Sequence, residues 1–187
     1  MVITYPIFLK RKTRRRHKVF TKKKHVSYIT KCIKISIKKQ LLKDINEFTN
    51  SNLKKLRCFT KLAHTIQICE NSIQPEIINI IKTCARFQQH EDLEIQAQVT
   101  KVSRLVGAYI NSDIYIPLLI GLVADEESKN SIKFLISLLV IFSVMLKSEN
   151  TQTLEPHLEN IIKCLYTLEN AHPDNEEILH SLYLIDV

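Results

Sequence analysis

Glycine is nearly absent from this chain, which has two glycines in 187 residues, and tryptophan is missing altogether. The sequence also lacks a Gly-rich phosphate loop, an HExxH zinc motif and a G-x-S-x-G nucleophile elbow. Its seven histidines are scattered, and no His/Cys cluster has metal-ligand spacing. We therefore expect a non-enzymatic protein with no cofactor and no metal site, and an apolar content of 45% with so few glycines suits an all-α fold.

Signals for disulfides and for membrane insertion are also missing. The five cysteines are odd in number and contain no CxxC pair, which favours free thiols in a reducing compartment. The uncharged run at 134–146 has thirteen residues, whereas a membrane-spanning helix needs about 20. We expect this run to be a helix buried between neighbouring helices, in a cytoplasmic protein without a membrane partner.

Acidic residues are absent from the first 43 positions, which hold fifteen lysines and arginines, so all 19 Asp and Glu residues follow later. Residues 1–35 are expected to form a flexible basic arm, because like charges repel and little apolar area is available. Its clusters predict a nuclear-localisation or nucleic-acid patch, or a contact with an anionic surface; a transit peptide fits less well because the arm is Lys-dominated and Ser-poor. The candidate residues are Lys10, Arg11, Lys12, Arg14, Arg15, Arg16, Lys22, Lys23 and Lys24.

The segment 72–111 has the clearest helical pattern. Apolar residues recur in steps of three and four from Ile77 to Phe87 and again from Ile95 to Tyr109, which predicts two helices with one apolar stripe each. The polar stretch QQHEDLE joins them, so the helices should be antiparallel neighbours. The acidic pairs in such joints, Glu91/Asp92 and Glu126/Glu127, are explained by helix capping and the helix dipole rather than by catalysis.

Three prolines repeat at regular spacing along the chain. Pro75, Pro117 and Pro156 lie 42 and 39 residues apart, each near the start of an apolar-periodic segment, where a missing N–H costs little. Ser72, Asp113 and Thr153 are the predicted N-caps before them. A two-helix unit of about 40 residues is typical of HEAT and armadillo repeats.

We therefore predict an α-solenoid of about four HEAT-like antiparallel helix pairs over residues 36–187. The predicted pairs are 36–70, 72–111, 113–148 and 153–187. Asp174 and Glu177 predict a capping box at the last helix. No polar capping repeat follows that helix, so we expect an exposed apolar end face and a chain that associates there, frays there, or is part of a longer solenoid. The residues of that face are Leu179, Leu182, Tyr183 and Ile185, backed by Ile161 and Leu165.

Gly107 is predicted to lie near the end of the second return helix, packed against the next incoming helix with no room for a side chain. It belongs to the segment LEIQAQVTKVSRLVGAYINSDIYIPLLIGLV, residues 93–123, which resembles the HEAT repeats of the dynein axonemal assembly factor numbered five. In that family a return helix ending in a Leu-Val/Ile-Gly-x-Phe/Tyr-like run is followed by a short turn and an incoming helix. The matching positions are Leu105, Val106, Gly107, Tyr109, Asp113, Tyr115, Leu118 and Leu119.

The resemblance extends over about residues 36–187, and it implies a cytoplasmic, non-enzymatic scaffold for the preassembly of axonemal dynein arms in motile cilia or flagella. It implies axonemal dynein chains and chaperones as protein partners, held in the groove that successive return helices form. The alternative is a nucleic-acid- or nuclear-transport-associated HEAT protein that acts through the basic arm. The two hypotheses differ in salt dependence, because phosphate contacts weaken steeply with salt.

Overall fold

The structure is a computed structural model that describes residues 40, 42–45, 51–148 and 151–185. The basic arm, with all nine of its candidate residues, lies outside these described residues. Everything described belongs to one compact unit, Lys38–Val187. The elements within the described ranges are all helices, and none of these residues forms a strand.

The helices follow one another as antiparallel pairs with short connections. Residues 40 and 42–45 are helical and precede the first return helix. The remaining elements are α2 (Asn52–Cys69), the 3-10 helix η1 (Glu70–Glu76), α3 (Ile77–Phe87), α4 (Leu93–Tyr109), α5 (Ser112–Val123), α6 (Glu126–Asn130), α7 (Ile132–Leu146), α8 (Thr151–Leu154), the 3-10 helix η2 (Glu155–His157), α9 (Leu158–Ala171) and α10 (Glu176–Tyr183).

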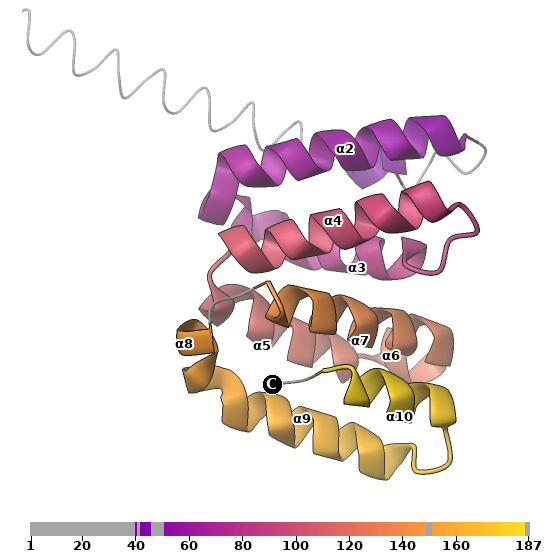
Figure 1. Ribbon diagram of the computed structural model, residues 1–187, viewed down its shortest axis with the longest axis vertical. Coiled ribbons are helices and arrows are strands. Elements are labelled where there is room, and N and C mark those ends of the chain that lie inside the picture. Colours follow the sequence, from indigo (N-terminus) through magenta and orange to yellow (C-terminus); the bar gives the residue numbers. More distant parts are fainter. Residues whose placement is uncertain (1–39, 41, 46–50, 149–150, 186–187) are drawn as a thin grey trace, which may run out of the picture. The chain divides into compact units, whose positions relative to one another are not determined.

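These helices form two layers. The return helices α2, α4, α7 and α10 pack side by side in one layer, which lies in front in Figure 1. The incoming helices α3, α5 and α9 form the other layer. Each incoming helix is followed along the chain by its return helix, so the predicted all-α solenoid of stacked antiparallel pairs is confirmed.

Four hydrogen bonds between neighbouring pairs repeat at nearly the same sequence offset. The Asn52 side chain donates to the Asp92 carboxylate at 3.0 Å, and the Asn71 side chain accepts from the Asn111 N–H at 3.0 Å; both offsets are 40 residues. The Ser112 hydroxyl donates to the Thr153 carbonyl and the Ser143 hydroxyl to the Leu184 carbonyl, at offsets of 41. The period of about 40 residues is therefore a physical register between stacked pairs.

The uncharged run at 134–146 forms most of α7 and lies at the centre of the core. Eleven residues of α7 are buried, because α3, α4, α5 and α10 all pack around it. Leu138, Leu139, Ile141, Phe142 and Met145 have no exposed surface. No helix in the described ranges is both long and apolar enough to cross a membrane.

Two of the predicted caps before the prolines are wrong because both residues lie inside helical segments and not before them. Ser72 lies inside η1 with Pro75, and Thr153 lies inside α8, just before η2 and its Pro156. Both prolines therefore sit in tight turns that lead into α3 and α9. A 3-10 turn at a helix N-terminus satisfies part of the backbone without a side-chain cap.

The other predicted caps are displaced by one or two residues. Asn111, and not Asp113, caps α5, and its side chain accepts from the Asp113 N–H at 3.0 Å. Asn175, and not Asp174, caps α10 by accepting from the Ile178 N–H at 3.0 Å. Asp92 does cap α4, as its place in the interhelical joint predicts.

Gly107 has a different neighbour from the predicted one. A Cβ added at Gly107 would overlap the Met145 carbonyl and stand 3.0 Å from the Met145 Cα. The close contact is therefore with the return helix α7 and not with the incoming helix α5. Backbone meets backbone there, so the stacking of α4 on α7 requires glycine at this position.

The C-terminal end face is smaller than predicted. Leu182 and Ile185 are buried, and so is Ile161 behind them, whereas Tyr183 is 76% exposed. The apolar surface that remains open surrounds a hollow of about 230 Å³ lined by Ile162, Leu165, Tyr166, Glu169, Leu179, Leu182 and Tyr183.

Candidate protein-binding surface

The outer surface of the return-helix layer carries exposed aliphatic and basic side chains. We call this surface the return-helix face. It comprises Leu53, Arg57, Lys61, His64, Leu93, Lys101, Arg104 and Ile132, all of which are exposed.

The 40-residue register between α2 and α4 aligns these side chains in rows. The bonds Asn52–Asp92 and Asn71–Asn111 fix the two helices near both of their ends. By the same offset, Lys101 has the register position of Lys61, Arg104 that of His64 and Leu93 that of Leu53. Packed helices lie about 8–10 Å apart, so each row presents like side chains at that spacing.

The aliphatic row continues onto α7. Leu53 is 58% exposed, Leu93 is 75% exposed and Ile132 is 47% exposed, and they lie in the first turns of α2, α4 and α7 respectively. Contiguous exposed apolar patches with a polar rim mark surfaces that bind other proteins, and this row is the candidate for such a patch on the return-helix face.

The basic rows of the return-helix face lack carboxylate partners. Arg57, Lys61, Lys101 and Arg104 form no ion pair within the described part of the chain. Helix α2 contains no Asp or Glu at all. The positive potential of this surface is therefore available to an acidic partner.

Lys55 is the one lysine of α2 that turns inward. It is buried, its Nζ lies 3.3 Å from His90 Nε2, and the same Nζ lies 5.3 Å from the centre of the Phe87 ring. The His90 Nδ1 accepts from the Asp92 N–H at 3.0 Å. These contacts hold the α3–α4 connection against α2. Lys55 therefore stabilises the fold and does not belong to the return-helix face.

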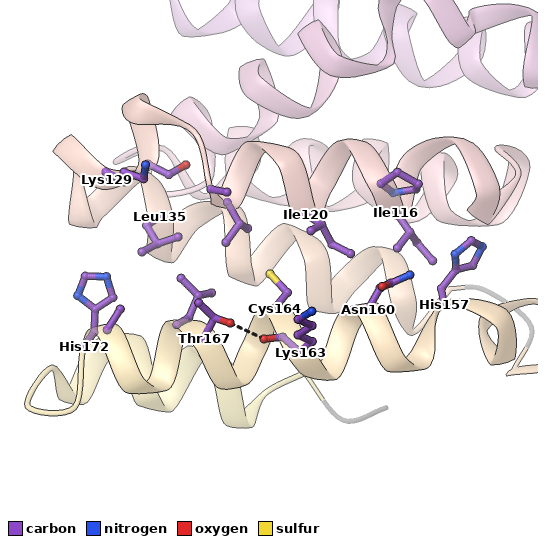
Figure 2. A pocket seen from close by; sticks show the side chains of 16 residues that line it. Ile116, Ile120, Lys129, Leu135, His157, Asn160, Lys163, Cys164, Thr167 and His172 are labelled. Carbon is purple, nitrogen blue, oxygen red and sulfur yellow. Dashed lines mark hydrogen bonds between the residues drawn. The ribbon is translucent and has the colours of Figure 1, made fainter.

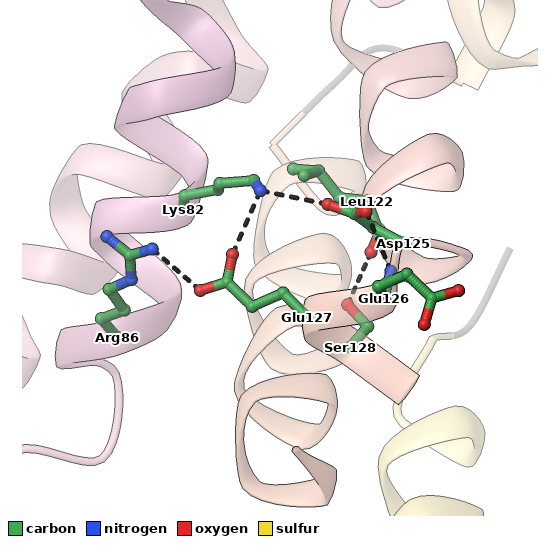
Figure 3. Close-up of polar contacts among 7 residues, drawn as sticks. All are labelled: Lys82, Arg86, Leu122, Asp125, Glu126, Glu127 and Ser128. Carbon is green, nitrogen blue, oxygen red and sulfur yellow. Dashed lines mark hydrogen bonds and ion pairs between the residues drawn. The ribbon is translucent and has the colours of Figure 1, made fainter. Parts of the chain in front are cut away.

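The opposite layer is held by charges that are paired. Lys82 Nζ lies 3.1 Å from both Asp125 Oδ2 and Glu127 Oε2, and Arg86 Nη2 lies 2.8 Å from Glu127 Oε1 (Figure 3). The hydrogen bond from Arg86 is the main cause that lowers the pKa of the Glu127 carboxyl. Hydrogen bonds to Asp125 and Glu127 raise the pKa of Lys82. These pairs clamp α3 to the connection that follows α5.

The chain matches the family described as "Dynein axonemal assembly factor 5, HEAT-repeat domain" over residues 29–186. It belongs to this family. No curated protein and no solved structure matches the chain. The dynein axonemal assembly factor 5 HEAT-repeat match includes every described residue, so the return-helix face lies inside the family domain.

The nine candidate residues of the arm precede the matched dynein axonemal assembly factor 5 HEAT-repeat domain and are not among the described residues, so that binding patch stays a prediction. Within the described part of the domain, no group of three or more His, Cys, Asp or Glu residues could hold a metal ion. His64 is exposed, and His90, His157 and His172 are partly buried.

Sequence reasoning placed a partner against the return helices but did not identify the residues of the return-helix face, because it considered the charge that follows the basic arm only as a total. The missed signal was the absence of Asp and Glu from 52–69 together with cations at positions 57, 61, 101 and 104. It also explained Glu127 by the helix dipole, whereas Glu127 pairs with Lys82 and Arg86 across the stack.

Proposed function

We propose that this chain is a non-catalytic HEAT-repeat scaffold that acts in the cytoplasm in the preassembly of axonemal dynein arms. Membership of the dynein axonemal assembly factor 5 HEAT-repeat family supports this function. The scaffold that we propose comprises four helix pairs, at 36–70, 72–111, 113–148 and 153–187, and a basic arm at 1–35 that precedes them in the sequence.

The proposed binding surface for an axonemal dynein chain or its chaperone is the return-helix face. The observation that carries this assignment is the alignment of exposed aliphatic and unpaired basic rows across α2 and α4. A partner segment with carboxylates and apolar side chains would complement both rows at once. Electrostatic complementarity would then set orientation and association rate, and the apolar contacts would slow dissociation.

The test is affinity purification from ciliated cells with the full chain and two charge-reversal variants. Wild type should co-purify dynein heavy or intermediate chains together with chaperones. The double variant Lys61→Glu/Lys101→Glu should lose most of this capture, because two like charges now face the acidic partner. Lys147→Glu, at an exposed position after the last residue of α7 and outside both the return-helix face and the pocket residues used below, is the control and should retain it.

Salt dependence separates this proposal from the nucleic-acid alternative. Neutralising about four phosphates would lower the log of the affinity by roughly 3.6 for each tenfold rise in salt. A surface anchored by Leu53, Leu93 and Ile132 should show a much shallower slope. Capture that disappears with nuclease treatment, or that follows the steep slope, would contradict the dynein-assembly proposal.

A further inference from the structure

The incoming-helix layer contains an apolar groove between α5 and α9 that the proposed function does not use. It encloses about 580 Å³, a volume within the usual range of ligand sites. Figure 2 shows side chains from both helices pointing into it. The lining residues that matter below are Ile116, Ile120, Leu135, Cys164, Thr167 and Leu168.

The groove exists because α5 and α9 are joined at one end only. The Ser112 hydroxyl donates to the Thr153 carbonyl at 3.1 Å, and His157 Nε2 lies 2.9 Å from Asp113 Oδ1, all near the start of the two helices. Further along, α5 contains no Lys or Arg that could make a clamp like that of Lys82 and Arg86 one joint earlier. The helices therefore leave the space between them open.

The shape of the groove fits a helix. On α9 its lining runs from Asn160 to Ala171 in steps of three and one, which is a continuous stripe of about 17 Å at 1.5 Å per residue. Ile116 and Leu168 form part of a buried floor, and Ile120 and Cys164 are partly exposed above it. An amphipathic helix of three to four turns would lay one apolar face along such a stripe.

The charge of the groove selects the partner. No Asp or Glu is among its lining residues, whereas Lys129, Lys163, His157 and His172 are. Lys129 is paired with Glu126 and His157 with Asp113, but Lys163 and His172 have no ion-pair partner among the described residues. An acidic group on the bound helix would complement Lys163 at the rim.

We propose that the α5–α9 groove docks an amphipathic helix that has an apolar face flanked by Asp or Glu. The basic arm of the same chain is a poor occupant, because residues 10–24 contain ten Lys or Arg and no carboxylate. The groove lies between α5 and α9 in the layer opposite the return-helix face, so this proposal does not rest on the proposed function.

The test uses a fluorescent 14-residue helical peptide with leucines at i, i+3, i+7 and i+10 and glutamates on the flanks. A control peptide has lysine in place of every glutamate. Binding is measured by anisotropy with the full-length chain in a Cys32→Ser background. In the same samples the rate of Cys164 alkylation reports occupancy, because Cys58, Cys69 and Cys84 are buried.

We expect the glutamate peptide to bind and to slow Cys164 alkylation at least about fivefold. Lys163→Glu should weaken it about tenfold, which corresponds to about 1.4 kcal/mol, and should favour the lysine peptide. Thr167→Trp, at the open edge of the groove, should block it. Lys101→Glu, on the return-helix face, should bind the peptide as wild type does. This variant therefore distinguishes failure of the groove proposal from failure of the dynein-assembly proposal.

Several results would overturn this inference. One is equal binding of both peptides that Lys163→Glu leaves unchanged while circular dichroism shows that the variant is folded. Another is Cys164 that is already unreactive without peptide, which would mean that the groove is covered. A third is protection of Cys164 by laurate that neither peptide can displace, which would make the groove a fatty-acid site.

Discussion

Replacing Gly107 by alanine should destabilise the stack of α4 on α7. The added Cβ would overlap the Met145 carbonyl and lie 3.0 Å from both its carbonyl carbon and its Cα, so the backbone of one helix has to move. Overpacking of this kind costs about 1–3 kcal/mol, and the better helix propensity of alanine returns about 1 kcal/mol. We expect a net loss of up to about 2 kcal/mol, and a larger loss for Gly107→Leu.

Gly121 supplies a matched control within the same chain. It also lies inside a helix, α5, but a Cβ added there meets no atom within 4 Å. Gly121→Ala should therefore stabilise the protein by about 0.5–1 kcal/mol, because only the backbone entropy changes. The difference between the two variants isolates the steric cost at Gly107.

The assay is urea unfolding of both variants, followed by circular dichroism at 222 nm. The midpoint should fall for Gly107→Ala and rise for Gly121→Ala, with little change in the slope. A thermal scan should show a difference of about 2–4 °C for each kcal/mol. A Gly107→Ala protein as stable as Gly121→Ala would show that α4 and α7 do not approach closely, and would refute the reasoning.

Three further predictions concern the clamp, the thiols and the end face. A double-mutant cycle with Arg86→Ala and Glu127→Gln should give a coupling free energy of about 0.2–1 kcal/mol. Because folding lowers the pKa of Glu127, this stabilisation is complete above the ordinary pKa of 4.5 and disappears as the pH falls through the lowered pKa. Coupling that persists at pH 2 would contradict this prediction. Cys164 should be alkylated well before Cys84, since burial raises the pKa of the Cys84 thiol to about 12; equal rates would contradict the burial. Tyr183→Glu should reduce any self-association seen by light scattering, and a wild-type chain that stays monomeric at high concentration would show that the end face needs no partner.

The repeat architecture was predictable because it depends on spacing alone. The interval between Pro75, Pro117 and Pro156 reflects the 40- and 41-residue offsets that the Asn52–Asp92 and Ser143–Leu184 hydrogen bonds later define. A periodic fold leaves the same signal in every repeat, so a regular pattern survives even where single caps are assigned wrongly.

Features that depend on which surfaces meet were not predictable in the same way. Asn111 and Asp113 are both good capping residues, and the turn geometry alone decides that Asn111 is the cap. The neighbour of Gly107 was misassigned because sequence shows that a position is tight without showing which helix is close. The α5–α9 groove depends on the absence of an ion-pair clamp from α5 like that of Lys82 and Arg86 on α3. The two helices that form the groove are far apart in the sequence, so no local sequence pattern predicts it.

Crosslinking from the return-helix face tests the central claim most directly. A photoreactive benzoylphenylalanine at Leu93, the most exposed aliphatic residue of that face, is compared with one at Tyr166, which is exposed on α9. In ciliated cells we expect the Leu93 probe to crosslink an axonemal dynein chain or an assembly chaperone, and the Tyr166 probe to give much less of that product. Dynein crosslinks from Tyr166 but none from Leu93 would contradict the account, because the partner would then lie against the other layer.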